Sequence, residues 1–268
     1  MIISSETINS VFHSFNTVFN MAFAAAEVRY LKVAMEVPSE TRDETYAWLG
    51  ATPSMREWIS EREIKNLATY DYTIKNRDFE LTVSVPRNDI EDDRIGVYKP
   101  IMQDLAYSAK LHPDKLVFEL FPKAFTEKCF DGKPFISDQH KPLYSNAKIA
   151  EQSNKGTSKL TPDSYGAARS QMMTLMNDEG EPLYIIPDLL VVAPQNEAVA
   201  RKILMADEIQ QGTNIYKDTA ELLVVPELAT HPAQWFLLCT KRPIKPFIFQ
   251  NRVLRLAAKA GDTLPAAE

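Results

Sequence analysis

The sequence predicts an α+β protein, and three features of the chain lead to this prediction. Apolar residues recur at helical spacing in residues 8–23 and again in residues 94–125. Short apolar runs follow toward the end of the chain, as expected of strands. Eight glycines and seventeen prolines among 268 residues indicate many short elements that are joined by stiff turns.

Residues 8–23 predict an amphipathic helix. Its apolar positions, at helical spacing, are Ile8, Val11, Phe12, Phe15, Val18, Phe19, Ala22 and Phe23. Such a helix either docks on the core of its own chain or forms an N-terminal arm that packs on a neighbouring subunit. The residues alone leave both interpretations open.

Residues 41–75 have no regular apolar pattern, yet Trp48 and Trp58 lie there among charged and turn residues. Large aromatic side chains in a segment too polar to build a core are expected to cover a core or to contact another chain. The alternating stretch FELTVSV, residues 79–85, predicts a strand with one exposed face, and we expect it to pair with the preceding DYTIK.

Residues 94–125 predict one long helix. The acidic run DIEDD, residues 89–93, precedes it, and carboxylates there suit the positive end of the helix dipole. Pro113 lies inside the pattern, and its ring removes a hydrogen bond and clashes with the preceding turn. We therefore expect the helix to bend at Pro113.

The second half of the chain predicts a compact mixed module over residues 160–225. A polar loop, residues 145–159, leads into a helix that is capped by Thr161 and has Pro162 at its first position. The expected buried positions of two helices in the module are Tyr165, Ala168, Met172, Leu175, Met176, Val199 and Ile203. The expected strands of this half are PLYIIPDLLVVAP, AELLVVP, WFLLC and KPFIFQ.

The composition predicts a soluble protein without a strong field for DNA or anionic lipid, because the formal net charge is −6 and the pI is about 5.4. Two cysteines, Cys129 and Cys239, do not make a disulfide framework. No Lys or Arg precedes Arg29, unlike in a signal peptide. Because no stretch approaches the roughly 18 apolar residues that span a bilayer, we expect no membrane contact.

The stretch CFDGKPFISDQHK, residues 129–141, gathers the residue types of a hydrolase or a metal site. A hydrolase would use Ser137 or Cys129 with His140, but the sharp G-x-S-x-G turn of many serine hydrolases is missing. Cys129 and His140 offer a metal two ligands, and no C-x-x-C or H-x-x-x-H pattern supplies a third. The Asp-Gly pair within the stretch favours a tight turn. We therefore predict a turn, with no catalytic, cofactor-binding or metal-binding residue.

Five segments run in order from residue 46 to residue 250, and they are YAWLGATPSMREW, DIEDDRIGVYKPIMQDLAYSA, FDGKPFISDQHK, GEPLYIIPDLLVVAPQNEAVARKIL and WFLLCTKRPIKPFIFQ. Together they resemble the Mu-like prophage major head subunit family, often called gpT. Members of this family are major capsid proteins of tailed phages. The resemblance implies the HK-ninety-seven-type capsid fold and a structural protein of the virion, with no enzymatic activity and no cofactor.

The resemblance also implies four parts of the chain. They are an N-terminal arm (1–40), an extended loop that reaches over a neighbour (41–78), a peripheral domain (79–159 and 226–268) with a spine helix at about 94–125, and an axial domain (160–225). Self-assembly into pentamers and hexamers of an icosahedral shell in the host cytoplasm is implied as well. The implied partners are scaffold or protease, portal and decoration proteins, and the shell would enclose DNA without sequence-specific binding.

The end of the chain departs from the family pattern, because many relatives continue past KPFIFQ into further strands. Residues 251–268 are instead short and alanine-rich. We expect FIFQ, residues 247–250, to lie near an uncovered sheet edge, and residues after about Arg255 to be poorly ordered.

Two alternatives to a major capsid protein stay open at this point. One is a minor head or adaptor protein that shares the fold. The other is the hydrolase that would use Ser137 or Cys129 with His140.

Overall fold

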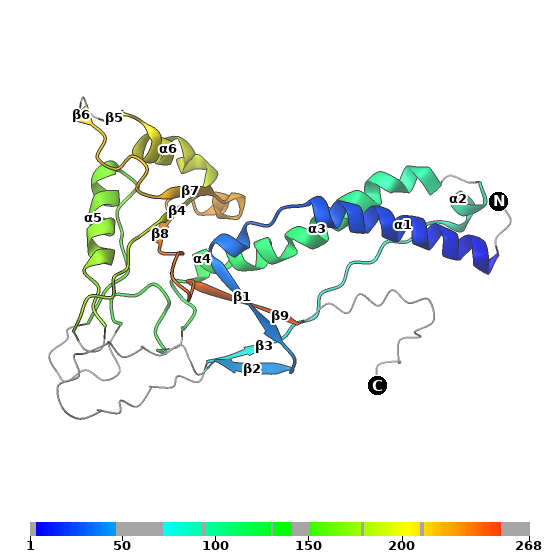
Figure 1. The fold of residues 1–268 in the computed structure, drawn as a ribbon, viewed down its shortest axis with the longest axis horizontal. Helices are drawn as coiled ribbons and strands as arrows, with labels where there is room; N and C mark the ends of the chain where they lie inside the picture. The colour runs from blue at the N-terminus through cyan, green and yellow to red at the C-terminus, as the bar shows by residue number, and fades with distance from the viewer. Residues whose placement is uncertain are drawn as a thin grey trace, which may run out of the picture.

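The computed structural model describes residues 4–46, 72–92, 95–129, 131–140, 151–177, 180–209 and 212–252. An arm of two long helices leads into a small parallel sheet and then into a compact module of helices and strands (Figure 1). The α+β class predicted from the sequence is confirmed. Within the described ranges, no helix combines the length and the apolar character needed to cross a membrane.

The arm consists of α1 (Ser5–Ala25) and α3 (Lys99–Phe118), which lie side by side (Figure 1). The side chain of Ser4 caps α1 by accepting a hydrogen bond from the backbone N–H of Thr7 at 3.2 Å. Val11 and Phe15 of α1 are buried against Met102 of α3. The helix predicted over residues 8–23 is therefore confirmed, and it docks on the spine of its own chain.

The predicted spine over residues 94–125 consists of η3 (Ile95–Tyr98), α3 and α4 (Leu120–Lys123). The helix α3 continues through Pro113, and the interruption falls later, between Phe118 and Leu120. The acidic run that was expected at the start of α3 begins instead in a separate short helix, α2 (Arg87–Glu91), and the first turn of α3 has no acidic residue.

Two small two-stranded sheets lie between the arm and the module (Figure 1). Parallel pairing joins β1 (Ala34–Ser39) to β9 (Phe247–Arg252), with Ala34 opposite Phe247. Antiparallel pairing joins β2 (Asp43–Tyr46) to β3 (Tyr72–Lys75). These two strands bracket residues 47–71, so Trp48 and Trp58 lie outside the described residues.

The strand predicted at residues 79–85 is wrong. The DYTIK segment does form a strand, β3, but its partner is β2, and residues 79–85 continue along α3 without strand pairing (Figure 1). Apolar and polar residues do alternate over residues 79–85, but the apolar ones are not buried on one face. Phe79 and Leu81 are 53% and 59% exposed.

The compact module is built on a three-stranded sheet in the order β7-β4-β8. The central β4 (Leu189–Val192) is parallel to β7 (Glu221–Val224) and antiparallel to β8 (Trp235–Leu238). All four residues of β4 are buried, and they alternate between two cores. Leu189 and Val191 pack against the spine, whereas Leu190 and Val192 pack within the module. This sheet is thus a wall shared by two cores, and burial of both its faces explains the unbroken apolar run LLVV.

Two helices cover the module side of this sheet, α5 (Pro162–Met173) and α6 (Glu197–Met205). Thr161 caps α5 together with Ser164, as the cap at Thr161 predicted. Tyr165 and Ile203 are buried as predicted. Val199 and Met176 are instead 40% and 46% exposed, because the buried face of α6 consists of Ala200, Ile203 and Leu204, and α5 ends before Met176.

The remaining short elements are η1 (Tyr30–Lys32), η4 (Pro194–Asn196), η5 (Pro226–Thr230), β5 (Glu208–Ile209) and β6 (Gly212–Thr213). The strand β9 includes FIFQ and ends at Arg252, and among the described residues its only strand partner is β1. The prediction about residues beyond Arg255 falls outside the described part of the chain.

Candidate functional site

The stretch from Cys129 to His140 folds as a turn, as the Asp-Gly pair predicted. Gly132 has a φ of 77°, a conformation that favours glycine. The Asp131 carboxylate accepts a hydrogen bond from the backbone N–H of Lys133 at 2.9 Å. The N–H of Cys129 closes the turn by donating to the carbonyl of Lys133 at 2.7 Å.

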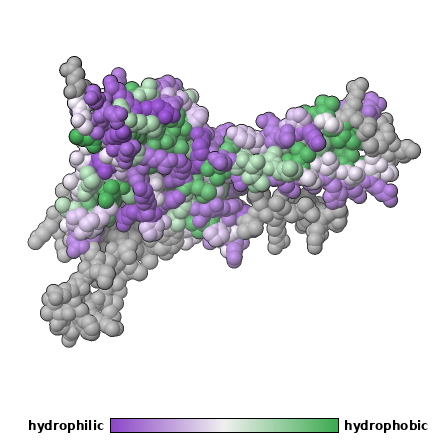
Figure 2. Space-filling model, turned by 45° about the horizontal axis from the view of Figure 1, so that its top comes forward, coloured by the Kyte–Doolittle hydropathy of each residue, from purple (hydrophilic) through white to green (hydrophobic). Residues whose placement is uncertain are grey.

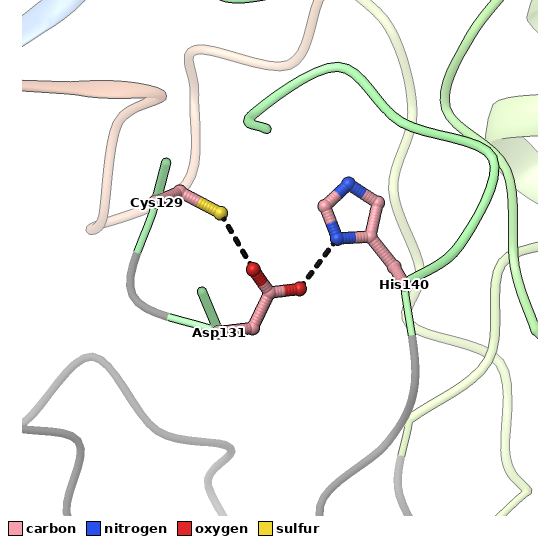
Figure 3. Close-up of side chains that lie close together, drawn as sticks. All are labelled: Cys129, Asp131 and His140. Carbon is pink, nitrogen blue, oxygen red and sulfur yellow. Dashed lines mark hydrogen bonds and ion pairs between the residues drawn. The ribbon is translucent and has the colours of Figure 1, made fainter. Parts of the chain in front are cut away.

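The turn brings Cys129, Asp131 and His140 together (Figure 3). The thiol of Cys129 donates to Oδ1 of Asp131 at 3.0 Å, and Nδ1 of His140 lies 2.6 Å from Oδ2. His140 is held in place by backbone hydrogen bonds with Gln152 of 3.2 and 2.9 Å. One carboxylate therefore lies between a thiol and an imidazole.

This arrangement does not provide the nucleophile and base of a hydrolase. Burial, and then the hydrogen bond to Asp131, raises the pKa of the Cys129 thiol to about 12, so the thiol is protonated at neutral pH. The imidazole of His140 contacts Asp131 rather than the sulfur. Among the described residues, the Oγ of Ser137 is bonded to the backbone N–H of Gln139 at 3.2 Å and not to an imidazole or a carboxylate. The geometry thus favours the turn over the catalytic alternative.

Burial on its own raises the pKa of the Asp131 carboxyl. The hydrogen bonds from Cys129, His140 and the N–H of Lys133 outweigh burial and hold that pKa below its usual value. Asp131 is therefore an anion that organises the turn. In the sequence, Asp131 stands among the polar residues of this stretch together with Ser137 and Asp138. It was assigned to the Asp-Gly turn, and only Cys129 and His140 were considered as a metal-binding pair.

A second polar cluster anchors the hairpin that brackets residues 47–71. The side-chain NH₂ of Asn76 donates to Oγ of Ser39 at 2.8 Å and to the carbonyl of Thr41 at 2.7 Å. Gln250 of β9 accepts from the hydroxyl of Tyr46 at 2.8 Å and donates to Oδ1 of Asn76 at 2.7 Å. The base of the hairpin is thus fixed to the β1–β9 sheet through Asn76 and Gln250, two residues that the sequence did not single out.

Asp114 of α3 fixes the segment that follows α1 to the spine. Its side chain is 2% exposed and accepts from the backbone N–H of Tyr30 at 2.7 Å and from that of Arg29 at 2.9 Å. The guanidinium of Arg29 lies 3.8 Å from the same carboxylate and also donates to the carbonyl of Val224 in β7 at 3.1 Å. Arg29 and Asp114 therefore connect three parts of the chain: the segment after α1, the helix α3 and the module.

The arm exposes several large apolar side chains to solvent. Figure 2 shows apolar side chains gathered along the arm and in further patches over the module. Large exposed apolar side chains of α1, η3 and α3 are Phe12, Met21, Val97, Ile101 and Tyr107. A broad groove of about 2100 Å³ runs between α1, α3, residues 74–81 and β9. Apolar surface of this extent is typical of faces that contact other chains.

The sequence is similar to those of phage and prophage head proteins. The family described as Mu-like prophage major head subunit gpT matches residues 8–164 and 155–228. The chain is 40% identical over 146 residues to the major capsid protein of Escherichia phage Mu, which covers 54% of this chain and 48% of that protein. It is 33% identical over 175 residues to the Mu-like prophage FluMu major head subunit of Haemophilus influenzae, which covers 65% and 56%. The chain thus spans about half the length of these curated relatives.

Solved structures from one phage resemble the fold over nearly their whole length. A chain of the procapsid of bacteriophage JBD30 has a TM-score of 0.72 and 27% identity, and the match covers 84% of this chain and 100% of that chain. A chain of the JBD30 capsid has a TM-score of 0.63 and 27% identity, with 85% and 100% covered. The JBD30 capsid decorated with minor capsid protein trimers matches with a TM-score of 0.59.

Proposed function

Because the chain belongs to the Mu-like prophage major head subunit gpT family, we propose that it is the major capsid protein of a tailed phage or prophage. Many copies would assemble into the icosahedral shell that encloses the DNA, and the protein would be part of the virion. The observation that carries this proposal is the match to the procapsid chain of JBD30, with all of that chain covered and a TM-score of 0.72.

The four parts that the family resemblance implies fit features of the structure. Residues 1–40 include α1 as the N-terminal arm, and residues 41–78 include the hairpin β2–β3 as the base of the extended loop. Residues 79–159 and 226–268 would form the peripheral domain, and residues 160–225 the axial domain. The shared sheet would then be the point where these two domains meet, because β8 pairs with β4.

The shell proposal also accounts for the exposed apolar side chains of the arm. A subunit of a closed shell buries large surfaces against its neighbours. Phe12 at 61% exposure and Met21 at 71% would be covered in the assembly rather than within the subunit. The hairpin β2–β3, anchored by Asn76 and Gln250, would hold the extended loop at a fixed angle toward a neighbour.

Further partners follow from the same proposal. The subunit would assemble in the cytoplasm of a bacterial host and meet a scaffold or protease, a portal and a decoration protein. It would enclose DNA without sequence-specific binding, in keeping with the formal net charge of −6. No enzymatic activity is proposed, because the protonated thiol of Cys129 and the bonded hydroxyl of Ser137 lack an activating base.

Electron microscopy and sedimentation of the purified full chain test the proposal. We expect shells, rings or capsomers, with the chain produced alone or together with the neighbouring head proteins of its genome. A chain that stays monomeric at high concentration under both conditions would contradict the proposal. Copy number in virions separates the alternatives, because a minor head or adaptor protein would be present in few copies.

A further inference from the structure

The cluster at the turn gathers three kinds of metal-binding atom. Sγ of Cys129, a carboxylate oxygen of Asp131 and a ring nitrogen of His140 all lie within 4.8 Å of one another. The spacing of Cys129 and His140 in the sequence offered only two ligands. The structure adds Asp131 as a third, because the tight turn at Gly132 presents its carboxylate between the other two side chains (Figure 3).

We propose that Cys129, Asp131 and His140 bind one divalent transition-metal ion of the zinc type. Thiolate sulfur, imidazole nitrogen and carboxylate oxygen are the three ligand types that zinc takes in proteins. Hard cations such as Mg²⁺ and Ca²⁺ prefer oxygen ligands, so a site with one sulfur and one nitrogen disfavours them.

The geometry requires only small shifts of the three side chains. Zinc–ligand bonds of about 2.0–2.3 Å place the ligands of a tetrahedral ion roughly 3.3–3.7 Å apart. The carboxylate lies closer than this to both neighbours, at 3.0 Å from Sγ and 2.6 Å from Nδ1, and all three ligand atoms lie within 4.8 Å of one another, so the ligands would spread around the ion. The carboxylate of Asp131 now accepts hydrogen bonds from both neighbours, and an ion bound between the three groups would take the place of these hydrogen bonds. The thiol proton would pass to solvent as the sulfur binds the metal. The proton on Nδ1 of His140 would also leave, and the neutral imidazole would carry its proton on Nε2 instead.

The exposure of the cluster allows an ion to reach it. The side chains of Asp131 and His140 are 12% and 21% exposed, so an ion could enter from solvent and a water could complete the tetrahedron. Of the two ring nitrogens of His140, Nδ1 faces Asp131 and Nε2 points away from the cluster (Figure 3), so Nδ1 would bind the ion.

A bound ion would fasten the start of the turn to its end. Cys129 follows the spine through α4, whereas His140 pairs with Gln152 on the way to the module. The metal would thus connect the chain that leaves the spine with the chain that enters the module. A thermal stabilisation by zinc is the expected consequence, because a ligand that binds the native state stabilises it.

Titration of the full chain, purified without a histidine tag, with Co²⁺ tests the site. Tetrahedral cobalt bound to a thiolate gives visible absorption and a sulfur-to-cobalt charge-transfer band in the near ultraviolet. We expect the band to saturate at one Co²⁺ per chain and to disappear when Zn²⁺ is added. The variant C239S removes the other free thiol and should keep the band unchanged.

Variants of the three ligands make the test specific. C129S should abolish the charge-transfer band, and H140A and D131N should lower the affinity for Co²⁺ by about tenfold or more. Circular dichroism of each variant, compared with that of C239S, shows whether the chain is folded. The proposal is overturned if the unchanged protein gives no charge-transfer band, or if folded C129S gives the same band.

Discussion

The central strand β4 and the arm formed by α1 and α3 bury their apolar residues to very different degrees. Every residue of β4 is at most 1% exposed, and each of its faces packs against a core of its own. Between α1 and α3, by contrast, the buried cluster is small and consists of Val11, Phe15 and Met102, each 8–9% exposed. Val117 and Phe118 at the far end of α3 belong to the core beneath the sheet instead. Phe12 and Met21 of the same helix α1 remain largely exposed.

This difference indicates which surfaces the subunit completes alone. The shared sheet buries its apolar residues within the subunit, and we expect it to determine the stability of the isolated subunit. The arm keeps apolar residues exposed to solvent, and under the shell proposal neighbouring subunits cover them. The two regions should therefore respond differently to substitution, one through folding and the other through assembly.

The largest expected effect is on the shared sheet. Leu190→Ala leaves a cavity in the module core, and we expect a loss of about 2–5 kcal/mol in the free energy of unfolding. Leu31→Ala, at a side chain that is 40% exposed, should cost much less. Urea unfolding of the unassembled subunit measures both changes. Equal losses for the two variants would show that the shared sheet does not determine stability.

The next largest loss of stability is expected at the contact between Asp114 of α3 and the segment that follows α1. Asp114→Ala leaves the backbone N–H groups of Arg29 and Tyr30 without their acceptor. We expect a loss of about 2–3 kcal/mol in the free energy of unfolding. The matched control is Asp104→Ala, which removes an exposed carboxylate from the same helix and should change stability little. A loss for D114A no greater than for D104A would contradict this role of Asp114.

A glycine in the module tests how tightly its helices pack. A Cβ added at Gly166 would lie 2.0 Å from the hydroxyl oxygen of Tyr216, so the Tyr216 ring must move. We expect Gly166→Ala to lower the free energy of unfolding by about 1–3 kcal/mol. Gly156→Ala has open space around the added methyl group and serves as the control. A G166A protein as stable as G156A would mean that the contact between α5 and Tyr216 is loose.

Alkaline pH should destabilise the protein at the junction of arm and sheet. Burial, and then the negative charge of Glu36, raises the pKa of Tyr30 to about 12 from its usual 10.0. A raised folded-state pKa gives stability that is present below pH 10 and lost as the pH rises toward 12. Tyr30→Phe has no ionisable group and should lose less stability across this range. The pH dependence of urea unfolding for the two proteins measures the difference, and identical curves would contradict it.

A substitution on the exposed face of α1 should change folding least and assembly strongly. Phe12→Asp places a charge at an exposed position of α1, and we expect the free energy of unfolding to change by less than about 0.5 kcal/mol. Assembly should fall sharply, because burying an unpaired carboxylate at a subunit contact is costly. Asn16→Asp adds the same charge at an exposed polar position of the same helix. Sedimentation should show assembly of N16D and not of F12D; equal assembly would remove Phe12 from the contact.

Local patterns in the sequence predicted most elements of the fold. The stripe in residues 8–23, the cap at Thr161 and the apolar runs at β4, β7, β8 and β9 all led to the correct element, because each signal depends on neighbouring residues alone. The pairing of residues 79–85 could not be predicted in this way. The strand β3 pairs with β2, which lies before residues 47–71, rather than with the adjacent residues 79–85. Asn76 fixes that pairing, because its side chain donates to Ser39 and Thr41 on the far side of residues 47–71.

The candidate sites were predictable only in part, for the same reason. Cys129 and His140 were visible as a pair, but the position of Asp131 between them depends on the backbone conformation at Gly132. Asp114 looked like one more helical carboxylate, and only the fold places it against the N–H groups of Arg29 and Tyr30. Contacts between residues far apart in the chain leave no pattern in a single sequence.

Amide hydrogen exchange, compared between the unassembled subunit and the assembled shell, shows whether neighbouring subunits complete the arm. We expect equal protection of the β4 amides in both states, because the subunit buries this sheet by itself. We expect α1 and residues 79–85 to gain protection in the shell, where neighbours cover them. Equal protection of α1 and residues 79–85 in subunit and shell would contradict the claim that these surfaces are completed by assembly.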